Sequence, residues 1–157
     1  EGRARHGLDG AWRYRLEGTE HVLMEVPFRG PIDLLVALAE RTEEAGLRPV
    51  IAHPERTESV LAEPELALEL FERGWALQVN ASSLLGRHGE DREALGWALV
   101  EAEVVSVVAS DGHRETRPAR LDEAFARVRA RFGDTVARPL FDGSAVGLGA
   151  PSLARAS

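Results

Sequence analysis

The stretch "VIAHPER" (residues 50–56) decides the fold. It begins as an apolar, β-branched run, which is typical of a buried strand. It ends abruptly on a histidine, a proline, a glutamate and an arginine. Such an ending is either a polar turn or a reactive group of side chains at the end of a strand, and the remainder of the chain decides between the two.

Three more runs of this kind occur, so that strands are expected at residues 21–27, 48–54, 75–81 and 104–111. Each run is followed by a helical pattern, at 32–46, 64–74, 91–102 and 121–133, and the runs start 27 to 29 residues apart. Three of the helices carry apolar residues at helical spacing, which predicts their inward faces. These residues are Leu34, Leu35, Leu38 and Ala39; Leu66, Leu70 and Phe71; and Leu121, Ala124, Phe125, Val128 and Phe132.

Strands that alternate with helices at this length predict an α/β fold with parallel βαβ units. An open doubly wound sheet would carry a glycine-rich phosphate loop after its first strand, but "FRGPID" (28–33) has a single glycine. In a (β/α) barrel, reactive groups lie at the C-terminal ends of several strands. Polar residues do end all four runs here, so we expect part of a barrel. A half barrel would expose two strand edges and a large apolar face.

Composition excludes several classes of protein. The 157 residues suffice for a single domain (1–157), with the Gly-, Ala- and Ser-rich tail 143–157 expected to fray. The net charge of −7 disfavours nucleic-acid binding. The absence of cysteine excludes disulfides and thiolate metal sites and favours a cytoplasmic location. No apolar run is long enough for a membrane span.

Four of the strand-end residues form a set of candidate metal ligands: Glu25, His53, Asp111 and His113. Taken singly, each has an ordinary explanation, such as a turn histidine or an aspartate in a D-G turn. Together they provide carboxylate and imidazole groups from three strands, which suits Zn, Mn or Fe. Arg56 and Arg117 follow two of these strands closely. Beside a metal, their guanidinium groups would suit a phosphate, although both could also be solvated surface residues.

Other readings of the polar residues are weaker. A Ser-His-Asp triad from Ser110, His53 and Asp111 is disfavoured, since no G-x-S-x-G motif is present. His6, His21 and His88 are interpreted as structural or exposed. The segment "NASSLLGRHG" (80–89) could be a loop that faces the substrate, or a helix start that is capped by serine.

These residues, in this order, resemble the polymerase-and-histidinol-phosphatase (PHP) superfamily. More narrowly, they resemble its bacterial protein-tyrosine phosphatases of capsular and exopolysaccharide loci. The matching stretches cover residues 20–120 and are "VLMEVPF", "GLRPVIAHPER", "LFERGWALQVNASSLLGRHG" and "VVASDGHRETRP". The resemblance implies a distorted TIM-like (PHP) barrel that holds up to three divalent ions, often Mn, with Zn or Fe possible, and that hydrolyses phosphotyrosine through metal-activated water.

By the same resemblance, Glu25, His53, Asp111 and His113 would be metal ligands, and Arg56 and Arg117 would hold the phosphate. Glu1 could match one further ligand, a match supported by that residue alone. The family's opening H-x-H strand is not present, so we expect the C-terminal two-thirds of such an enzyme, with an incomplete metal site. A second departure is "NASS" (80–83), where relatives usually have a glycine before the serine.

The leading hypothesis is therefore a metal-dependent protein-tyrosine phosphatase. Its expected partner is a phosphotyrosine protein, such as a tyrosine kinase of a polysaccharide locus, and the chain could form a homo-oligomer. One alternative is a catalytically incomplete fragment that binds a ligand or has a structural role. Another is a different PHP phosphoesterase, acting on histidinol phosphate or a nucleotide.

Overall fold

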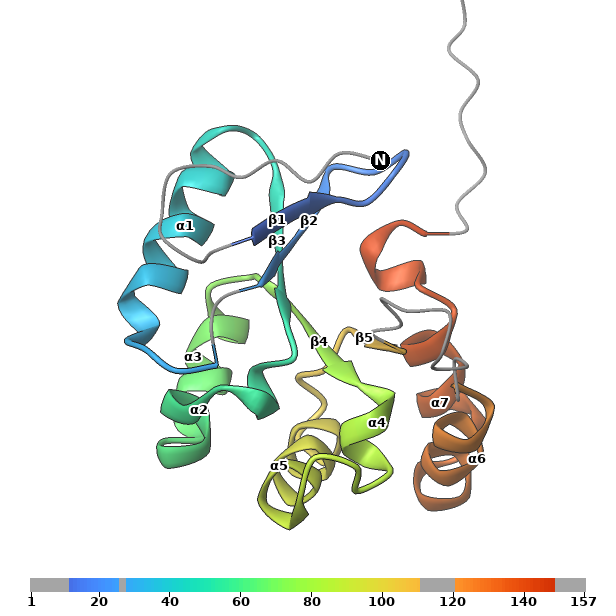
Figure 1. Ribbon diagram of the computed structural model, residues 1–157. Coiled ribbons are helices and arrows are strands. Elements are labelled where there is room, and N and C mark those ends of the chain that lie inside the picture. The colour runs from blue at the N-terminus through green and yellow to red at the C-terminus, as the bar shows by residue number, and fades with distance from the viewer. Residues whose placement is uncertain (1–11, 26–27, 111–120, 149–157) are drawn as a thin grey trace, which may run out of the picture.

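In the computed structural model, which describes residues 12–25, 28–110 and 121–148, the chain forms one five-stranded sheet with helices around it (Figure 1). The strands are β1 (Trp12–Arg15), β2 (His21–Glu25), β3 (Arg48–Ala52), β4 (Ala76–Asn80) and β5 (Val107–Ala109). The helices are α1 (Ile32–Glu44), α2 (Glu58–Ala62), α3 (Glu65–Glu72), α4 (Ala81–Leu84), α5 (Glu90–Glu101), α6 (Leu121–Phe132) and α7 (Asp134–Phe141), with 3₁₀ turns η1 (Pro54–Arg56) and η2 (Ser144–Val146).

The four predicted strands form the parallel part of the sheet. Strands β2, β3, β4 and β5 lie side by side in chain order, and each neighbouring pair is parallel. Helices connect them, α1 between β2 and β3, α3 between β3 and β4, and α5 between β4 and β5. The predicted α/β class with parallel βαβ units is therefore confirmed. In this arrangement the C-terminal ends of β2, β3 and β4 all meet at one edge of the sheet.

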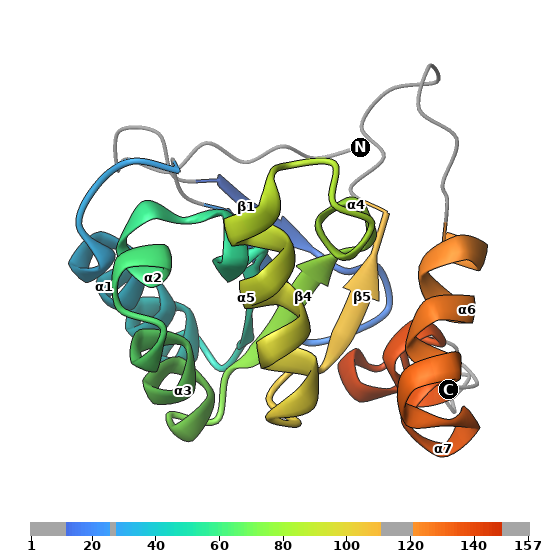
Figure 2. The ribbon, with the colours of Figure 1, turned by 90° about the horizontal axis from the view of Figure 1, so that it is seen from below.

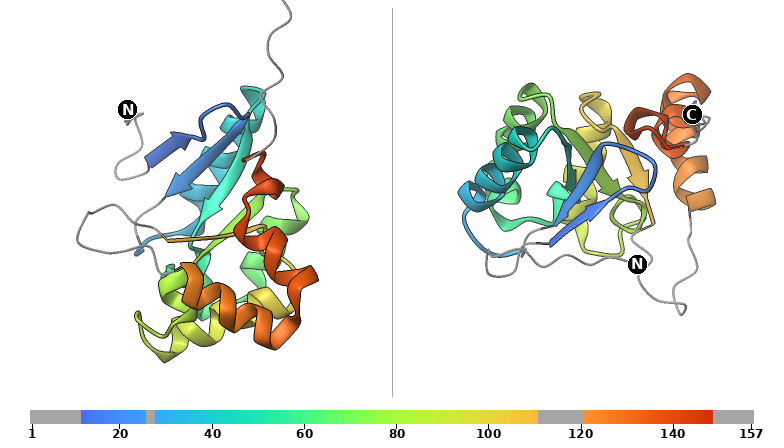
Figure 3. Two further views of the ribbon diagram at one scale, coloured as in Figure 1. Left: turned by 90° about the vertical axis from the view of Figure 1, so that its right-hand side faces the viewer. Right: turned by 90° about the horizontal axis from the view of Figure 1, so that it is seen from above.

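Strand β1 was not predicted from the sequence. It pairs with β2 in the antiparallel direction, with Trp12 opposite Glu25, and forms one edge of the sheet (Figure 3). The hairpin is closed by a hydrogen bond from the Leu16 backbone N–H to the His21 carbonyl (2.9 Å), and Gly18 takes a positive φ of 75° in its turn. The alternating apolar and arginine residues of "WRYR" are too few for a clear strand pattern, but they suit an edge strand.

One face of the sheet packs against α1, α3 and α5 (Figure 2). Alternate residues of each parallel strand point to this face, because successive side chains of a strand face opposite sides. The buried strand residues of this core are Val22, Met24, Ile51, Leu77, Val79 and Val108, and Ala124, Val128 and Ala137 of α6 and α7 join the same cluster. The core therefore fixes which strand residues are left to face the other side.

The opposite face carries a smaller cluster around Val50, Val107 and Val146, with Leu23 packed against it. Val146 belongs to η2 and is 1% exposed, so the chain after α7 folds back over this face. The prediction that the tail frays from Gly143 onward therefore does not hold for residues 144–146. Residues 149–157 lie outside the described part of the chain.

The predicted helix faces agree with the structure at most positions. Leu35, Leu38 and Ala39 of α1 and Leu70 of α3 are buried. Phe71 is an exception: it was predicted to point inward but is 40% exposed. Its neighbours Ala67 and Leu70 already supply the inward face of α3, which has eight residues and buries a narrow stripe. The short helices α2 and α7 were not predicted, and α4 was one of two alternatives for residues 80–89.

Within residues 12–25, 28–110 and 121–148, no helix has the length and apolar character that a membrane crossing requires. In the same part of the chain, β1 and β5 are the two edges of the sheet and do not pair with each other. The described strands therefore form an open sheet, and its being part of a barrel stays a prediction.

Candidate metal and phosphate site

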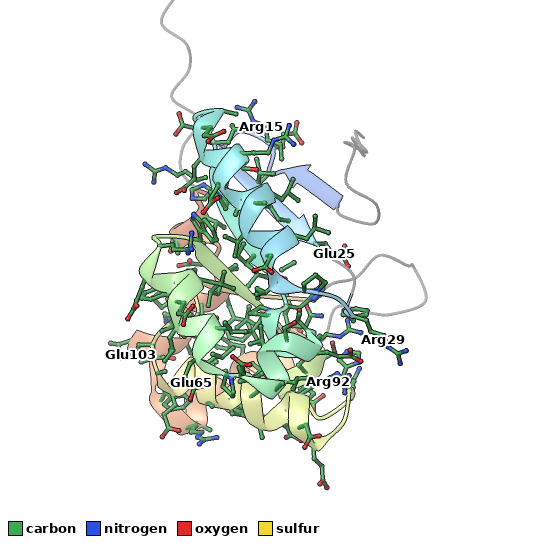
Figure 4. All side chains as sticks on the ribbon, turned by 90° about the vertical axis from the view of Figure 1, so that its left-hand side faces the viewer. Arg15, Glu25, Arg29, Glu65, Arg92 and Glu103 are labelled. Carbon is green, nitrogen blue, oxygen red and sulfur yellow. The ribbon has the colours of Figure 1, made fainter. Side chains whose placement is uncertain are left out.

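Glu25 and His53 come together at the C-terminal edge of the sheet. Glu25 is the last residue of β2, and His53 directly follows β3, which is the neighbouring parallel strand. The Nε2 atom of His53 lies 3.2 Å from Oε1 of Glu25. The histidine is almost fully buried, whereas the glutamate side chain is 26% exposed. Figure 4 shows Glu25 and Arg29 on the same side of the molecule, opposite Glu103.

The backbone at His53 has an uncommon conformation. Its φ of 34° and ψ of 59° lie in the left-handed region, which β-carbon contacts make costly for a residue other than glycine. The His53 N–H is held at 2.7 Å from the Gln78 carbonyl and at 3.2 Å from Gln78 Oε1. Its carbonyl accepts the Arg56 N–H at 2.9 Å. These bonds stop β3 sharply and aim the imidazole at Glu25. Strained backbone of this kind is concentrated at functional sites.

The described residues fit a divalent metal ion in chemistry but do not complete its ligand set. A carboxylate and an imidazole from neighbouring strands are suitable ligands for Mn, Zn or Fe. The Nδ1 atom of His53 is buried and has no hydrogen-bond partner among the described residues. Within that part of the chain, no group of three or more His, Asp or Glu side chains could hold a metal. The other predicted ligands, Asp111, His113 and Glu1, lie outside it.

Arg56 lies beside this pair and contacts an aromatic ring. Its guanidinium carbon is 4.4 Å from the centroid of the Phe28 ring. The same ring lies 5.4 Å from the imidazole of His53. Arg56 ends η1, whose first residue is Pro54, so it follows His53 within one short turn. The structure therefore brings three of the predicted site residues together, namely Glu25, His53 and Arg56. Arg117 lies outside the described residues.

Beneath His53, a buried glutamate that was not predicted as a site residue joins two strand ends. Glu55 has no exposed surface, and its Oε1 accepts the Asn80 backbone N–H at 3.0 Å and the Ser83 hydroxyl at 2.8 Å. Asn80 in turn accepts a hydrogen bond from Gln78 Nε2 at 2.8 Å. Helix α5 lies close to α4 at Gly96, which has no side chain. A Cβ at this position would lie 3.2 Å from the Leu84 side chain. The network couples the end of β3 to the end of β4.

Burial raises the pKa of Glu55, because the charged carboxylate loses its hydration. The hydrogen bonds from Asn80 and Ser83, and the nearby His53, act in the opposite direction. Since the folded-state pKa is raised, the contribution of this group to stability is fully present below the ordinary pKa of a glutamate. It is lost as the pH rises through the raised pKa.

We expect Glu55→Ala to lower the free energy of unfolding by roughly 3 kcal/mol, because it leaves a buried N–H and a buried hydroxyl without their acceptor. Glu55→Gln keeps one acceptor oxygen but cannot ionise, so its deficit relative to the unmodified chain should shrink as the pH rises above the ordinary pKa of a glutamate and through the raised pKa of Glu55. Urea unfolding in the presence of a chelator measures both effects. The exposed Glu69→Gln serves as the control. A deficit of Glu55→Gln that grows with pH would contradict the assignment.

The segment "NASSLLGRHG" begins with the short helix α4, and neither of its serines caps that helix. Helix α4 follows Asn80, whose side chain makes no capping hydrogen bond. The Ser83 hydroxyl donates to Glu55, and Ser82 Oγ lies 2.8 Å from His88 Nε2. A helix therefore does start here, as one of the two interpretations predicted, but the predicted serine cap is wrong. The sequence signal for these contacts was weak: Glu55 follows one predicted strand, and Ser82 and Ser83 follow the next.

Comparison with known proteins decides the family. A family model described as "Capsular polysaccharide synthesis, CpsB/CapC" matches residues 3–147, which is most of the chain. The chain belongs to the CpsB/CapC family. The resemblance to the tyrosine phosphatases of capsular loci is thereby confirmed.

Members of the CpsB/CapC family that resemble this chain are named as phosphatases. The tyrosine-protein phosphatase YwqE of Bacillus subtilis (strain 168) is 36% identical over 119 residues, which cover 75% of this chain and 47% of YwqE. The putative tyrosine-protein phosphatase CapC of Staphylococcus aureus is 30% identical over 122 residues, with 75% and 48% covered. The chain thus spans about half the length of these relatives.

A solved structure of the CpsB/CapC family supports the fold. It belongs to a study of YwqE from Bacillus subtilis and CpsB from Streptococcus pneumoniae, described there as "unique metal-dependent tyrosine phosphatases". The match has a TM-score of 0.70 and 35% sequence identity, and it covers 78% of this chain and 50% of the solved one.

Proposed function

We propose that this chain carries part of the active site of a metal-dependent protein-tyrosine phosphatase. The observation that carries the proposal is the contact of Glu25 with His53 at adjacent strand ends, with Arg56 beside them. The relatives support the type of reaction. Two of them are named as tyrosine-protein phosphatases, and the solved structures of YwqE and CpsB are described as those of metal-dependent tyrosine phosphatases. In the proposed enzyme, Asp111, His113 and Glu1 are further metal ligands and Arg117 is a second phosphate ligand.

In this proposal each described side chain has a defined task. Glu25 and His53 hold a divalent ion, with Mn preferred and up to three ions in the complete site. Such ions supply Lewis-acid activation of water and of phosphate oxygens. Arg56 binds the phosphate and neutralises charge that shifts during the transfer, because its fork of N–H groups matches phosphate oxygens. The 157 residues contain no cysteine, so this part of the proposed enzyme supplies no thiolate nucleophile.

The same proposal covers the wider setting. The sheet forms part of a distorted TIM-like barrel, whose C-terminal edge holds the site. The substrate is a phosphotyrosine protein, such as a tyrosine kinase of a polysaccharide locus, and the site works in the cytoplasm, with or without self-association of the chain.

The test is a chimera in which this chain replaces the matching part of the Bacillus subtilis relative; it is called the YwqE chimera below. We expect the chimera to hydrolyse a phosphotyrosine peptide and an aryl phosphate in the presence of Mn²⁺. Hydrolysis should cease when a chelator is added. We expect the 157-residue chain alone to be much less active, because the H-x-H ligands that the resemblance implies are not among its residues. A folded, metal-loaded chimera without phosphatase activity would contradict the proposal. A preference for histidinol phosphate or a nucleotide would favour another phosphoesterase.

A further inference from the structure

The most informative apolar residue near the site is Phe28, which follows β2 at the same sheet edge as Glu25. It is one of the few large apolar side chains in the described part of the chain that remain exposed, at 39%. A single exposed phenylalanine is ordinary on a protein surface. The position of this one is not, since its ring contacts both His53 and Arg56, at 5.4 Å and 4.4 Å.

The segment that carries Phe28 is fixed to the body of the protein. The Phe28 carbonyl accepts the Glu58 backbone N–H at 2.9 Å, where α2 begins. Two residues later, the Gly30 carbonyl accepts the Ser59 hydroxyl at 2.9 Å. An exposed ion pair between Arg29 and Glu58 adds little to this attachment. The ring is therefore held at its place by backbone contacts and not only by its own packing.

We propose that Phe28 is a specificity-determining residue whose ring packs against the aromatic ring of an aryl phosphate. The proposal rests on the proposed function, which places the phosphate between Arg56 and the Glu25–His53 pair. In a phosphotyrosine, one oxygen separates the phosphorus from the ring, so a phosphate held there brings its ring beside Phe28. Aromatic rings attract one another in offset or edge-to-face arrangements at centroid distances of about 4.5–7 Å. An alkyl phosphate, such as phosphoserine, has no ring for this contact.

The competing explanation is that Phe28 only supports Arg56 through the contact of its ring with the guanidinium group. The two explanations predict different results. Loss of support for Arg56 weakens the binding of every phosphate equally, since Arg56 meets the phosphate and not the group attached to it. Loss of a ring contact weakens the binding of aryl ligands alone. The ratio of aryl to alkyl affinity is therefore the decisive quantity.

The experiment measures binding of benzylphosphonate and ethylphosphonate to the 157-residue chain in the presence of Mn²⁺, by calorimetry or NMR titration. The two probes share the phosphonate charge and differ in the ring. We expect the unmodified chain to prefer benzylphosphonate, and Phe28→Ala to lower its affinity for that probe about tenfold while ethylphosphonate changes less than about twofold. Phe28→Tyr should restore the preference.

Phe71→Ala is the matched control, because Phe71 is 40% exposed and lies on α3. Circular dichroism and thermal unfolding show whether each variant folds, and Phe28→Leu replaces Phe28→Ala if the latter does not. An unchanged aryl-to-alkyl ratio, an equal loss for both probes, or no aryl preference in the unmodified chain would overturn the inference.

Hydrolysis is assayed separately in the YwqE chimera. Selective binding without hydrolysis would reject the proposed function alone, and hydrolysis without selectivity would reject the inference alone.

Discussion

Replacing His53 by asparagine in the YwqE chimera is expected to remove bound metal and phosphatase activity together. The imidazole is nearly buried and points at Glu25, so its loss would remove one ligand of the proposed ion and the contact that His53 makes with the carboxylate. Since changes to residues that merely support metal ligands cost about 10- to 100-fold in metal affinity, loss of a ligand should cost more than roughly a hundredfold.

Asparagine is preferable to alanine here because of the backbone. His53 has a left-handed conformation, which asparagine tolerates better than most residues. The variant therefore separates the loss of the ligand from backbone strain. His21→Asn is the control, because His21 lies at the other end of β2 from Glu25. Metal content is measured by mass spectrometry and turnover with an aryl phosphate. A variant that keeps its metal would show that His53 is a structural turn histidine.

Replacing Arg56 by alanine in the same chimera should lower turnover and leave metal content unchanged. A guanidinium group carries positive charge and does not bind metal ions, so its contribution is made to the phosphate oxygens. Loss of one preorganised donor costs about 3 kcal/mol in the transition state, or roughly a hundredfold in rate. The same expectation holds for Arg117→Ala.

The control for Arg56 is Arg73→Ala. The Arg73 guanidinium also lies over an aromatic ring, 5.2 Å from that of Trp75, but it belongs to the end of α3. If Arg56→Ala keeps full activity, Arg56 is an ordinary surface residue that happens to contact Phe28. If it loses metal as well, its role is structural.

The parallel core could be predicted because its signals are local. Each buried strand reads as an apolar run, and Gly46, Gly74 and Gly133 mark the ends of helical patterns. The hairpin with β1 escaped prediction because a four-residue edge strand leaves too short a pattern. The inward position predicted for Phe71 was wrong, because helical spacing does not show how much of the apolar face of α3 is buried against the sheet.

The candidate site could be predicted in part. Glu25 and His53 were expected to converge because both end parallel strands, and they do. Glu55 was missed because a glutamate in a polar turn resembles a solvated residue; its burial depends on Asn80 and Ser83, which are about 25 residues away along the chain. Phe28 was missed since an apolar residue after a strand signals no chemistry. The convergence of Asp111, His113 and Glu1 with this pair stays a prediction.

The hairpin has a consequence for association of the chain. A half barrel was expected to offer two bare strand edges, which invite intermolecular strand pairing. Instead, one edge is β1, a four-residue strand whose sequence alternates with arginine, and the other is β5, a three-residue strand that contacts α7. Short edges and like charges resist the addition of strands from another chain. Strand addition at the two edges that the described residues form is thus disfavoured, and we expect self-association of this part of the chain to use side-chain surfaces.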